Sequence, residues 1–132
     1  MEDLKNYFEQ SRGTGVLATA DGKGNVNGAL YARPHFMDDG TVAFIMNDRL
    51  THANIQENPA AAYVFIEEGS RSEGKRLYLR KAREEENPEL IQSLARRSYP
   101  AGEPGHSKKK FLVYFTVTKA LPLLGAGDDG EG

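Results

Sequence analysis

The chain has 132 residues, no cysteine and a formal net charge of −2 at pH 7. This length predicts one domain that can bury roughly two thirds of the surface of its unfolded chain. Without cysteine there is no disulfide, no thiolate nucleophile and no cysteine-ligated zinc or iron–sulfur centre. The slightly acidic balance gives no global electrostatic basis for binding nucleic acid or a membrane surface, so neither partner is expected.

The first ten residues, MEDLKNYFEQ, are acidic and amphipathic, which is unlike a secretion signal. No apolar run approaches the about 20 residues that cross a membrane as a helix. We therefore expect a cytoplasmic protein. The spacing of Leu4, Tyr7 and Phe8 predicts a helix over residues 2–12, with Gly13 as its C-terminal stop.

The rest of the chain has the pattern of short strands joined by turns. Runs of alternating or continuous apolar residues predict six strands, at residues 15–20, 26–37, 41–46, 60–68, 76–85 and 110–121. The strand at 41–46 is almost continuously apolar, which indicates that both of its faces are covered. The sequence Asn87-Pro88-Glu89 is a strong helix start. Six antiparallel strands with helices near the start, middle and end favour a small β-barrel with helices at its openings.

The segment MNDRLTHANIQENP, residues 46–59, follows an apolar strand and raises the main functional question. It reads as a polar turn and a short helix that an Asn-Pro pair stops. A helix N-terminus presents unpaired N–H groups and a positive dipole end, which favour an anion. Arg49 adds donors suited to phosphate oxygens, and Thr51 adds a hydroxyl. Alternatively, Asp48 or Thr51 caps the helix while Arg49 faces water, and the spacing alone leaves both interpretations open.

Other chemistries have less support in the residues. No Gly-x-Ser-x-Gly elbow is present, so hydrolase chemistry is not expected. His35, His52 and His106 are scattered and have no partner at ligand spacing, so no metal site is expected. Basic clusters at 71–76, 80–83, 96–97 and 108–110 are interleaved with glutamates, which is typical of a solvated surface. Single-stranded nucleic acid binding by a small barrel is therefore only a third alternative.

The order of the motifs indicates a family. GVLATAD, a hairpin, an alternating strand, TVAFIM and a polar turn are followed by THANIQENPAAAYVF, across residues 4–121. This order resembles the FMN-binding split barrel of the pyridoxamine 5'-phosphate oxidase-like superfamily and is most similar to small bacterial FMN-binding proteins. The resemblance implies a mainly β fold, a six-stranded antiparallel split β-barrel with flanking helices, over residues 1–121. Residues 122–132 are then a flexible acidic tail, and the protein is a homodimer with FMN at the subunit interface.

The resemblance also implies where FMN binds. One strand lines the flavin ring, the end of the neighbouring strand lies near the ring and ribityl chain, and the polar turn binds the phosphate. Two tyrosines match parts that approach the flavin of the partner subunit. In chain order, these candidates are Asn27, Gly28, Ala29, Leu30, Ile45, Met46, Asn47, Arg49, Leu50, Thr51, Tyr99 and Tyr114. No catalytic residue and no metal ligand is assigned.

The sequence departs from its relatives at two places. Leu50 stands at or beside the place of a common lysine in the phosphate turn, and Lys81 replaces a frequent glycine. The C-terminal arginine/tryptophan signature of true pyridoxamine 5'-phosphate oxidases is missing, which argues against vitamin B6 oxidation. The expected function is an FMN-binding redox protein, for electron transfer or as a flavin-dependent reductase or oxidase. The alternative is a non-catalytic split-barrel module whose ligand is lost or changed to heme or a deazaflavin.

Overall fold

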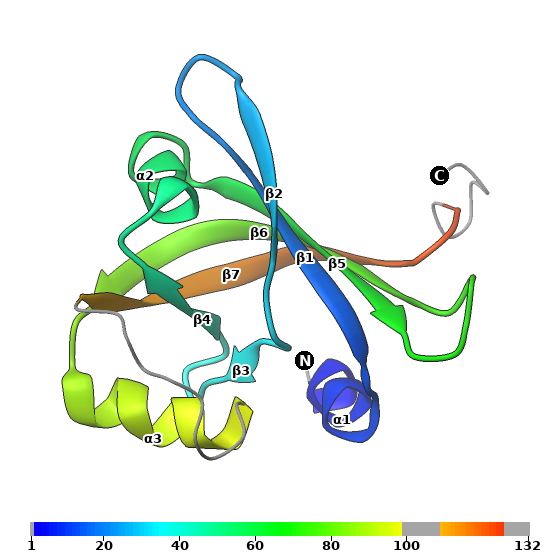
Figure 1. The fold of residues 1–132 in the computed structure, drawn as a ribbon. Helices are drawn as coiled ribbons and strands as arrows, with labels where there is room; N and C mark the ends of the chain where they lie inside the picture. Colours follow the sequence, from blue (N-terminus) through cyan, green and yellow to red (C-terminus); the bar gives the residue numbers. More distant parts are fainter. Residues whose placement is uncertain (1, 99–108, 126–132) are drawn as a thin grey trace.

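The computed structural model describes residues 2–98 and 109–125 of the chain, and in these ranges it consists of one curved antiparallel sheet with three α-helices (Figure 1). Along the chain, the elements are α1 Glu2–Gln10, β1 Gly13–Ala20, β2 Val26–Leu30, β3 His35–Phe36, β4 Val42–Asn47, α2 Leu50–Glu57, β5 Ala60–Glu67, β6 Gly74–Glu85, α3 Pro88–Ser98 and β7 Lys110–Pro122.

The strands follow the order β2-β1-β5-β6-β7-β4-β3, with antiparallel pairing between all neighbours. The two edge strands, β2 and β3, do not pair with each other, so the sheet curls but stays open between them. The mainly β, antiparallel class with flanking helices is confirmed. The predicted strand number of six is wrong, because the described sheet has seven strands and is not a closed barrel.

The additional strand arises because the predicted strand 26–37 is interrupted. The Tyr63 hydroxyl lies within hydrogen-bond distance of the carbonyl oxygens of Tyr31 and Ala32, at 3.2 and 3.1 Å, where a ladder would otherwise continue. Pro34 has no N–H to donate to a neighbouring strand. Gly15 makes room for this contact, because a Cβ at that position would collide with the Tyr63 hydroxyl. The chain therefore leaves β2, turns, and begins again as the short β3.

The core has two parts, which cover opposite faces of β4 and β7. The larger part fills the inside of the curved sheet and includes Phe8, Phe44, Tyr63 and Phe115. The smaller part lies beneath α3 and comprises Ala43, Ile91, Leu94, Leu112 and Tyr114. The prediction that the apolar strand at 41–46 is covered on both faces is confirmed.

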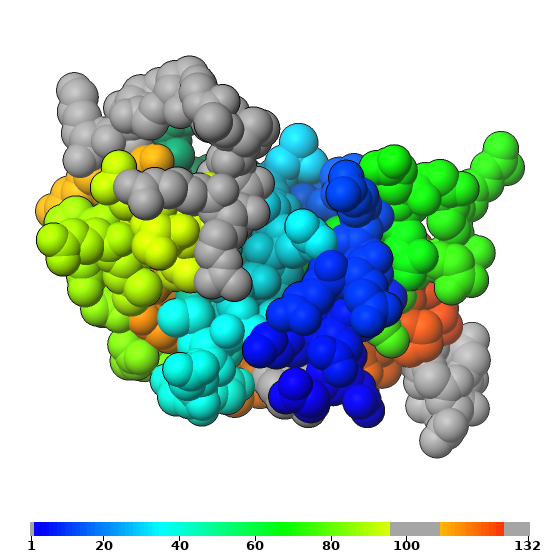
Figure 2. Space-filling model, turned by 90° about the horizontal axis from the view of Figure 1, so that it is seen from below, coloured from blue at the N-terminus to red at the C-terminus, as the bar shows by residue number. Residues whose placement is uncertain are grey.

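The helices lie at the two ends of the sheet (Figure 1). Figure 2 shows α1, the segment around β3, and α3 side by side across one end, and α2 lies toward the other. α3 begins where the sequence predicts: the Asn87 Oδ1 atom accepts hydrogen bonds from the N–H groups of Glu89 and Leu90, both at 3.1 Å. Within the described ranges, no helix has the length and apolar character needed to cross a membrane.

Two predicted segments lie partly or wholly beyond these ranges. The Pro/Gly loop at 99–107, with Tyr99, is outside the described residues. Of the predicted acidic tail, residues 126–132 are outside them as well, while Pro122 belongs to β7 and pairs with Lys75.

Candidate functional site

The start of α2 has no side-chain cap. Arg49 is the N-cap residue in an extended conformation, and no side chain accepts a hydrogen bond from the first turn. The first backbone hydrogen bond of the helix is donated by the Ala53 N–H to the Arg49 carbonyl oxygen, at 2.9 Å. Neither Asp48 nor Thr51 therefore has the capping role that was the alternative interpretation. Such an end has orphan N–H groups and a positive dipole end available to an anion.

The candidates of the phosphate turn differ in accessibility. Arg49 is exposed, and the Leu50 side chain is 57% exposed. Thr51 is only 6% exposed, so little of its side chain is open to solvent. Arg49 is consequently the side chain of this turn that is best placed to reach a bound anion.

The candidates on β2 occupy both faces of an edge strand beside α2, which contacts β1, β2 and β4. Asn27 and Ala29 are half-buried, whereas Gly28 and Leu30 lie on the exposed outer face. A Cβ added at Gly28 would meet only the Val16 Cγ1 atom, at 3.4 Å. The chain itself therefore does not require glycine here, and the bare backbone is open to a flat ligand or another subunit.

The structure brings some of the remaining candidates to the start of α2 and separates others from it. Asn47 ends β4 beside the turn and is exposed, while the Met46 side chain is fully buried in the larger core, which leaves only its backbone for a ligand. Ile45 and Tyr114 instead pack in the smaller core beneath α3. Tyr99 lies outside the described residues.

Tyr114 is held by charged neighbours on the α3 side of the sheet. The Arg83 guanidinium lies over its ring, 3.6 Å from the centroid, and its hydroxyl donates a hydrogen bond to Glu85. Burial and the contact with the Glu85 carboxylate raise the pKa of Tyr114 above its ordinary value. These contacts give Tyr114 a structural role within one subunit, and its predicted approach to a partner's flavin stays a prediction.

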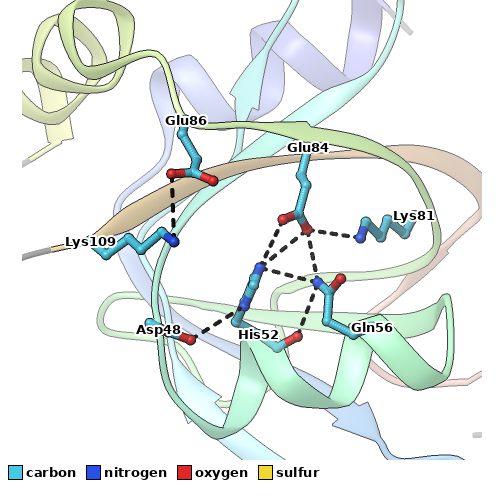
Figure 3. Close-up of polar contacts among 7 residues, drawn as sticks. All are labelled: Asp48, His52, Gln56, Lys81, Glu84, Glu86 and Lys109. Carbon is cyan, nitrogen blue, oxygen red and sulfur yellow. Dashed lines mark hydrogen bonds and ion pairs between the residues drawn. The ribbon is translucent and has the colours of Figure 1, made fainter.

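A polar cluster that the sequence did not indicate lies between α2 and β6 (Figure 3). The His52 Nε2 atom is 3.0 and 3.2 Å from the two carboxylate oxygens of Glu84, which also accepts hydrogen bonds from Lys81 and Gln56, each at 2.8 Å. A register shift of β6 between Lys81 and Arg83 accompanies this arrangement. The residues from α2 and those from β6 are far apart in sequence, and no local sequence motif predicts this register shift.

The environment of Glu84 keeps it ionised. Burial alone would raise its pKa, but hydrogen bonds from Lys81, Gln56 and His52 outweigh that effect and lower the pKa of Glu84 to about 2. Its carboxylate is therefore a fixed negative charge at neutral pH.

Glu84 should contribute to stability above its unfolded-state pKa and lose that contribution in acid. Since the folded-state pKa is the lower one, the stabilisation is complete above the ordinary value of 4.5 and disappears as pH falls toward 2. From pH 6 to pH 3, the stability advantage of the wild type over Glu84→Gln should shrink by about 2 kcal/mol. Urea unfolding at both pH values measures this, with the exposed Glu68→Gln as control; a constant difference would contradict the assignment.

A cavity of about 400 Å³ lies away from these residues, between α1, β3 and α3. Its lining mixes opposite charges with apolar groups, and includes Lys5, Glu9, Arg33, Asp38 and Leu94. None of the FMN-binding candidates within residues 2–98 and 109–125 lines it. Within the described ranges, no three side chains of the metal-binding types His, Asp and Glu gather to hold a metal ion.

Several solved structures share the fold. An FMN-binding protein from Syntrophomonas wolfei subsp. wolfei is 21% identical, with a TM-score of 0.72, and the match covers 92% of this chain and 84% of that one. An F420 reductase is 18% identical, with a TM-score of 0.65 and coverage of 87% and 94%. The heme storage protein HutZ from Vibrio cholerae is 18% identical, with a TM-score of 0.61 and coverage of 92% of both chains. At these identities, the likeness concerns the fold alone.

The family is shown by the sequence itself. No curated protein sequence matches the chain significantly. The family model described as pyridoxamine 5'-phosphate oxidase, by contrast, matches residues 1–120, which is nearly the whole described fold. The chain therefore belongs to the pyridoxamine 5'-phosphate oxidase family.

Proposed function

We propose that the protein binds FMN and works as a redox protein, in electron transfer or as a flavin-dependent reductase or oxidase. The observation that carries the proposal is the uncapped start of α2 with the exposed Arg49 at its N-cap. A phosphate there gains backbone N–H donors, a favourable dipole and a guanidinium fork. Membership of the family and the fold shared with an FMN-binding protein support the same ligand.

The described residues also fit the flavin ring. The exposed outer face of β2, where Gly28 has no side chain, offers a flat surface and backbone groups at an edge strand. FMN, when bound, supplies the redox chemistry, and the protein binds it, orients it and tunes its potential through hydrogen bonds. No side chain near this surface is assigned as a general acid or base, so the proposal names no catalytic residue.

The proposed assembly is a homodimer with FMN at the subunit interface. Among the described residues, four of the six exposed large apolar side chains lie on the outer face of the sheet formed by β2, β1, β5 and β6; they are Val26, Leu30, Ile66 and Tyr78. The register places the small residues Ala18 and Ala62 between them. A monomer would leave this apolar face in water, and a second copy of the chain would cover it.

A second candidate function is a non-catalytic module of the same fold with another ligand. Leu50 is exposed at the place where relatives commonly carry a cationic lysine, which weakens the case for phosphate. Lys81, at the place of a frequent glycine, points into the cluster with Glu84. Solved structures of this fold include a heme storage protein and an F420 reductase, so heme or a deazaflavin are the alternative ligands to test.

Arg49→Ala should weaken FMN binding by about tenfold to a hundredfold while riboflavin binding stays the same, because a charge-assisted hydrogen bond contributes about 1.5–3 kcal/mol and only FMN has the phosphate. Quenching of flavin fluorescence and the visible absorption spectrum measure both affinities. Arg71→Ala, an exposed arginine in the β5–β6 turn, is the matched control.

Wild-type protein that shows neither flavin absorption bands nor quenching at micromolar FMN would rule out the proposal. A bound chromophore after addition of heme or F420 to that same preparation would favour the second candidate. Equal loss of FMN and riboflavin in Arg49→Ala would show that Arg49 does not contact the phosphate.

A further inference from the structure

His52 is a buried histidine at the start of α2, directly after Thr51. It is 7% exposed, and its ring stacks on Phe111 of β7 with the centroids 3.8 Å apart and the planes 8° from parallel. The Lys109 ammonium lies 5.5 Å from the centroid of the same Phe111 ring. The stacking fixes the plane of the imidazole, so both ring nitrogens point in set directions (Figure 3).

The Nε2 atom of His52 faces a fixed anion. Glu84 lies 3.0 Å away, and Lys81 and Gln56 hold its carboxylate in place. The Gln56 side-chain nitrogen is also 3.1 Å from Nε2. With a proton on Nε2, His52 donates a hydrogen bond to Glu84. Without that proton, the lone pair of Nε2 faces a lone pair of the carboxylate oxygen, and only Gln56 can donate to the ring.

The Nδ1 atom faces a second carboxylate, on the other side of the ring. The Asp48 Oδ1 atom is 3.8 Å away, and the Asp48 side chain is 67% exposed. Asp48 directly precedes Arg49, the N-cap of α2, so its negative charge stands beside the proposed phosphate site. There it competes with a phosphate for the positive helix end.

The ring therefore lies between two carboxylates, and one proton cannot serve both. Neutral imidazole carries a single N–H and leaves the other nitrogen as an acceptor toward a carboxylate, while imidazolium donates on both sides. Histidine is the side chain whose charge ordinarily changes between pH 5 and 8. In its charged form, His52 offsets Asp48 and adds a positive charge next to Arg49.

We propose that His52 is a positioning residue for the phosphate of FMN: when protonated, it holds Asp48 aside and makes the start of α2 cationic, so phosphate affinity rises as pH falls. This inference rests on the proposed function. The charged groups near the ring are Asp48 from the turn and Lys81 and Glu84 from β6, and the Lys109 ammonium lies 5.5 Å from the centroid of the Phe111 ring on which His52 stacks.

His52→Gln tests the proposal because glutamine can still bond to Glu84 but cannot be protonated. FMN and riboflavin affinities are measured from pH 5.5 to 8.5 in the wild type and in the variant. The phosphate of FMN titrates identically in the two experiments. The ratio of the FMN affinities of the wild type and the variant at each pH therefore isolates the effect of His52. We expect the wild type to bind FMN about three- to fivefold more tightly than the variant at pH 5.5, as for a modest ion pair, and equally at pH 8.5. Riboflavin affinities should not differ.

Asp48→Asn provides a second variant at an exposed position where folding is not at risk. It should bind FMN about twofold to threefold more tightly than the wild type at pH 8.5 and equally at pH 5.5. Glu68→Gln, the same charge change in the β5–β6 turn, should leave both values unchanged.

If the ratio of the FMN affinities of the wild type and His52→Gln is the same at every pH, the proposal is overturned. A purely structural role of His52 would give such a constant ratio. The proposal would also be overturned if the ratio of wild-type to variant affinity changed with pH for riboflavin as it does for FMN, since the phosphate would then not be involved. Both of these outcomes leave FMN binding by the wild type intact, whereas a wild type that binds neither flavin removes the proposed function and this inference together.

Discussion

Gly28→Val should weaken the binding of FMN and riboflavin by about tenfold to a hundredfold, since an overpacked contact costs about 1–3 kcal/mol. The affected contact is the one proposed for the flavin ring, which both ligands share, so the loss should not discriminate between them as that of Arg49→Ala should. Gly28→Ala should give a smaller loss in the same direction. Fluorescence quenching titrations of the three proteins measure this order.

The same substitution should leave the fold intact. A Cβ atom at Gly28 would meet only the Val16 Cγ1 atom, at 3.4 Å, and a β-branched residue suits a strand better than glycine does. The free energy of unfolding in urea should stay within about 0.5 kcal/mol of the wild type. Normal flavin binding by Gly28→Val would place the ring elsewhere, and a large loss of stability would show that Gly28 serves the fold.

Ala62→Glu should convert the protein into a monomer. Ala62 lies at the centre of the outer face, between Ala18 of β1 and Tyr78 of β6. In a monomer, a glutamate there extends into water, but between two subunits its charge is buried without a partner, at a cost of about 3–5 kcal/mol per site. Flavin affinity should fall with the dimer, because the proposed site needs both subunits.

Light scattering coupled to size-exclusion chromatography measures the mass of each variant. Ala82→Glu is the matched control, since Ala82 is an exposed residue of β6 outside this set and should keep the wild-type mass. A dimeric Ala62→Glu would show that the subunits meet through another surface. A monomeric wild type would show that the outer face does not bind a second copy.

The sequence predicted correctly those elements that are determined by residues close together in the chain. The continuous apolar run of β4 indicated cover on both faces, which the two cores supply. The Asn87 cap lies within three residues of the groups that it bonds, so its pattern could be read directly. The class of the fold follows from many such signals together.

Contacts between distant residues account for what the sequence did not predict. The break between β2 and β3 depends on the hydroxyl of Tyr63, about thirty residues further along the chain. The alternation of apolar and polar residues in the predicted strand 26–37 gives no sign of a contact with a side chain of another strand. The pair of His52 and Glu84 likewise depends on a bulge in β6. Tyr114 and Ile45 were expected near FMN from the resemblance, but only the packing of α3 shows that their side chains face the smaller core.

The position of β7 in the sheet has a consequence for the order in which the protein folds. β4 pairs on one side only with the two residues of β3, and on the other with β7, which follows all the other described strands in the chain. Until β7 leaves the ribosome, the uncharged segment VAFIM has no long partner, and it has the apolar, proline-free character of segments that associate between chains. Such distant pairing slows folding and prolongs this exposure. β7 therefore completes the core and also shields an aggregation-prone segment of the nascent chain.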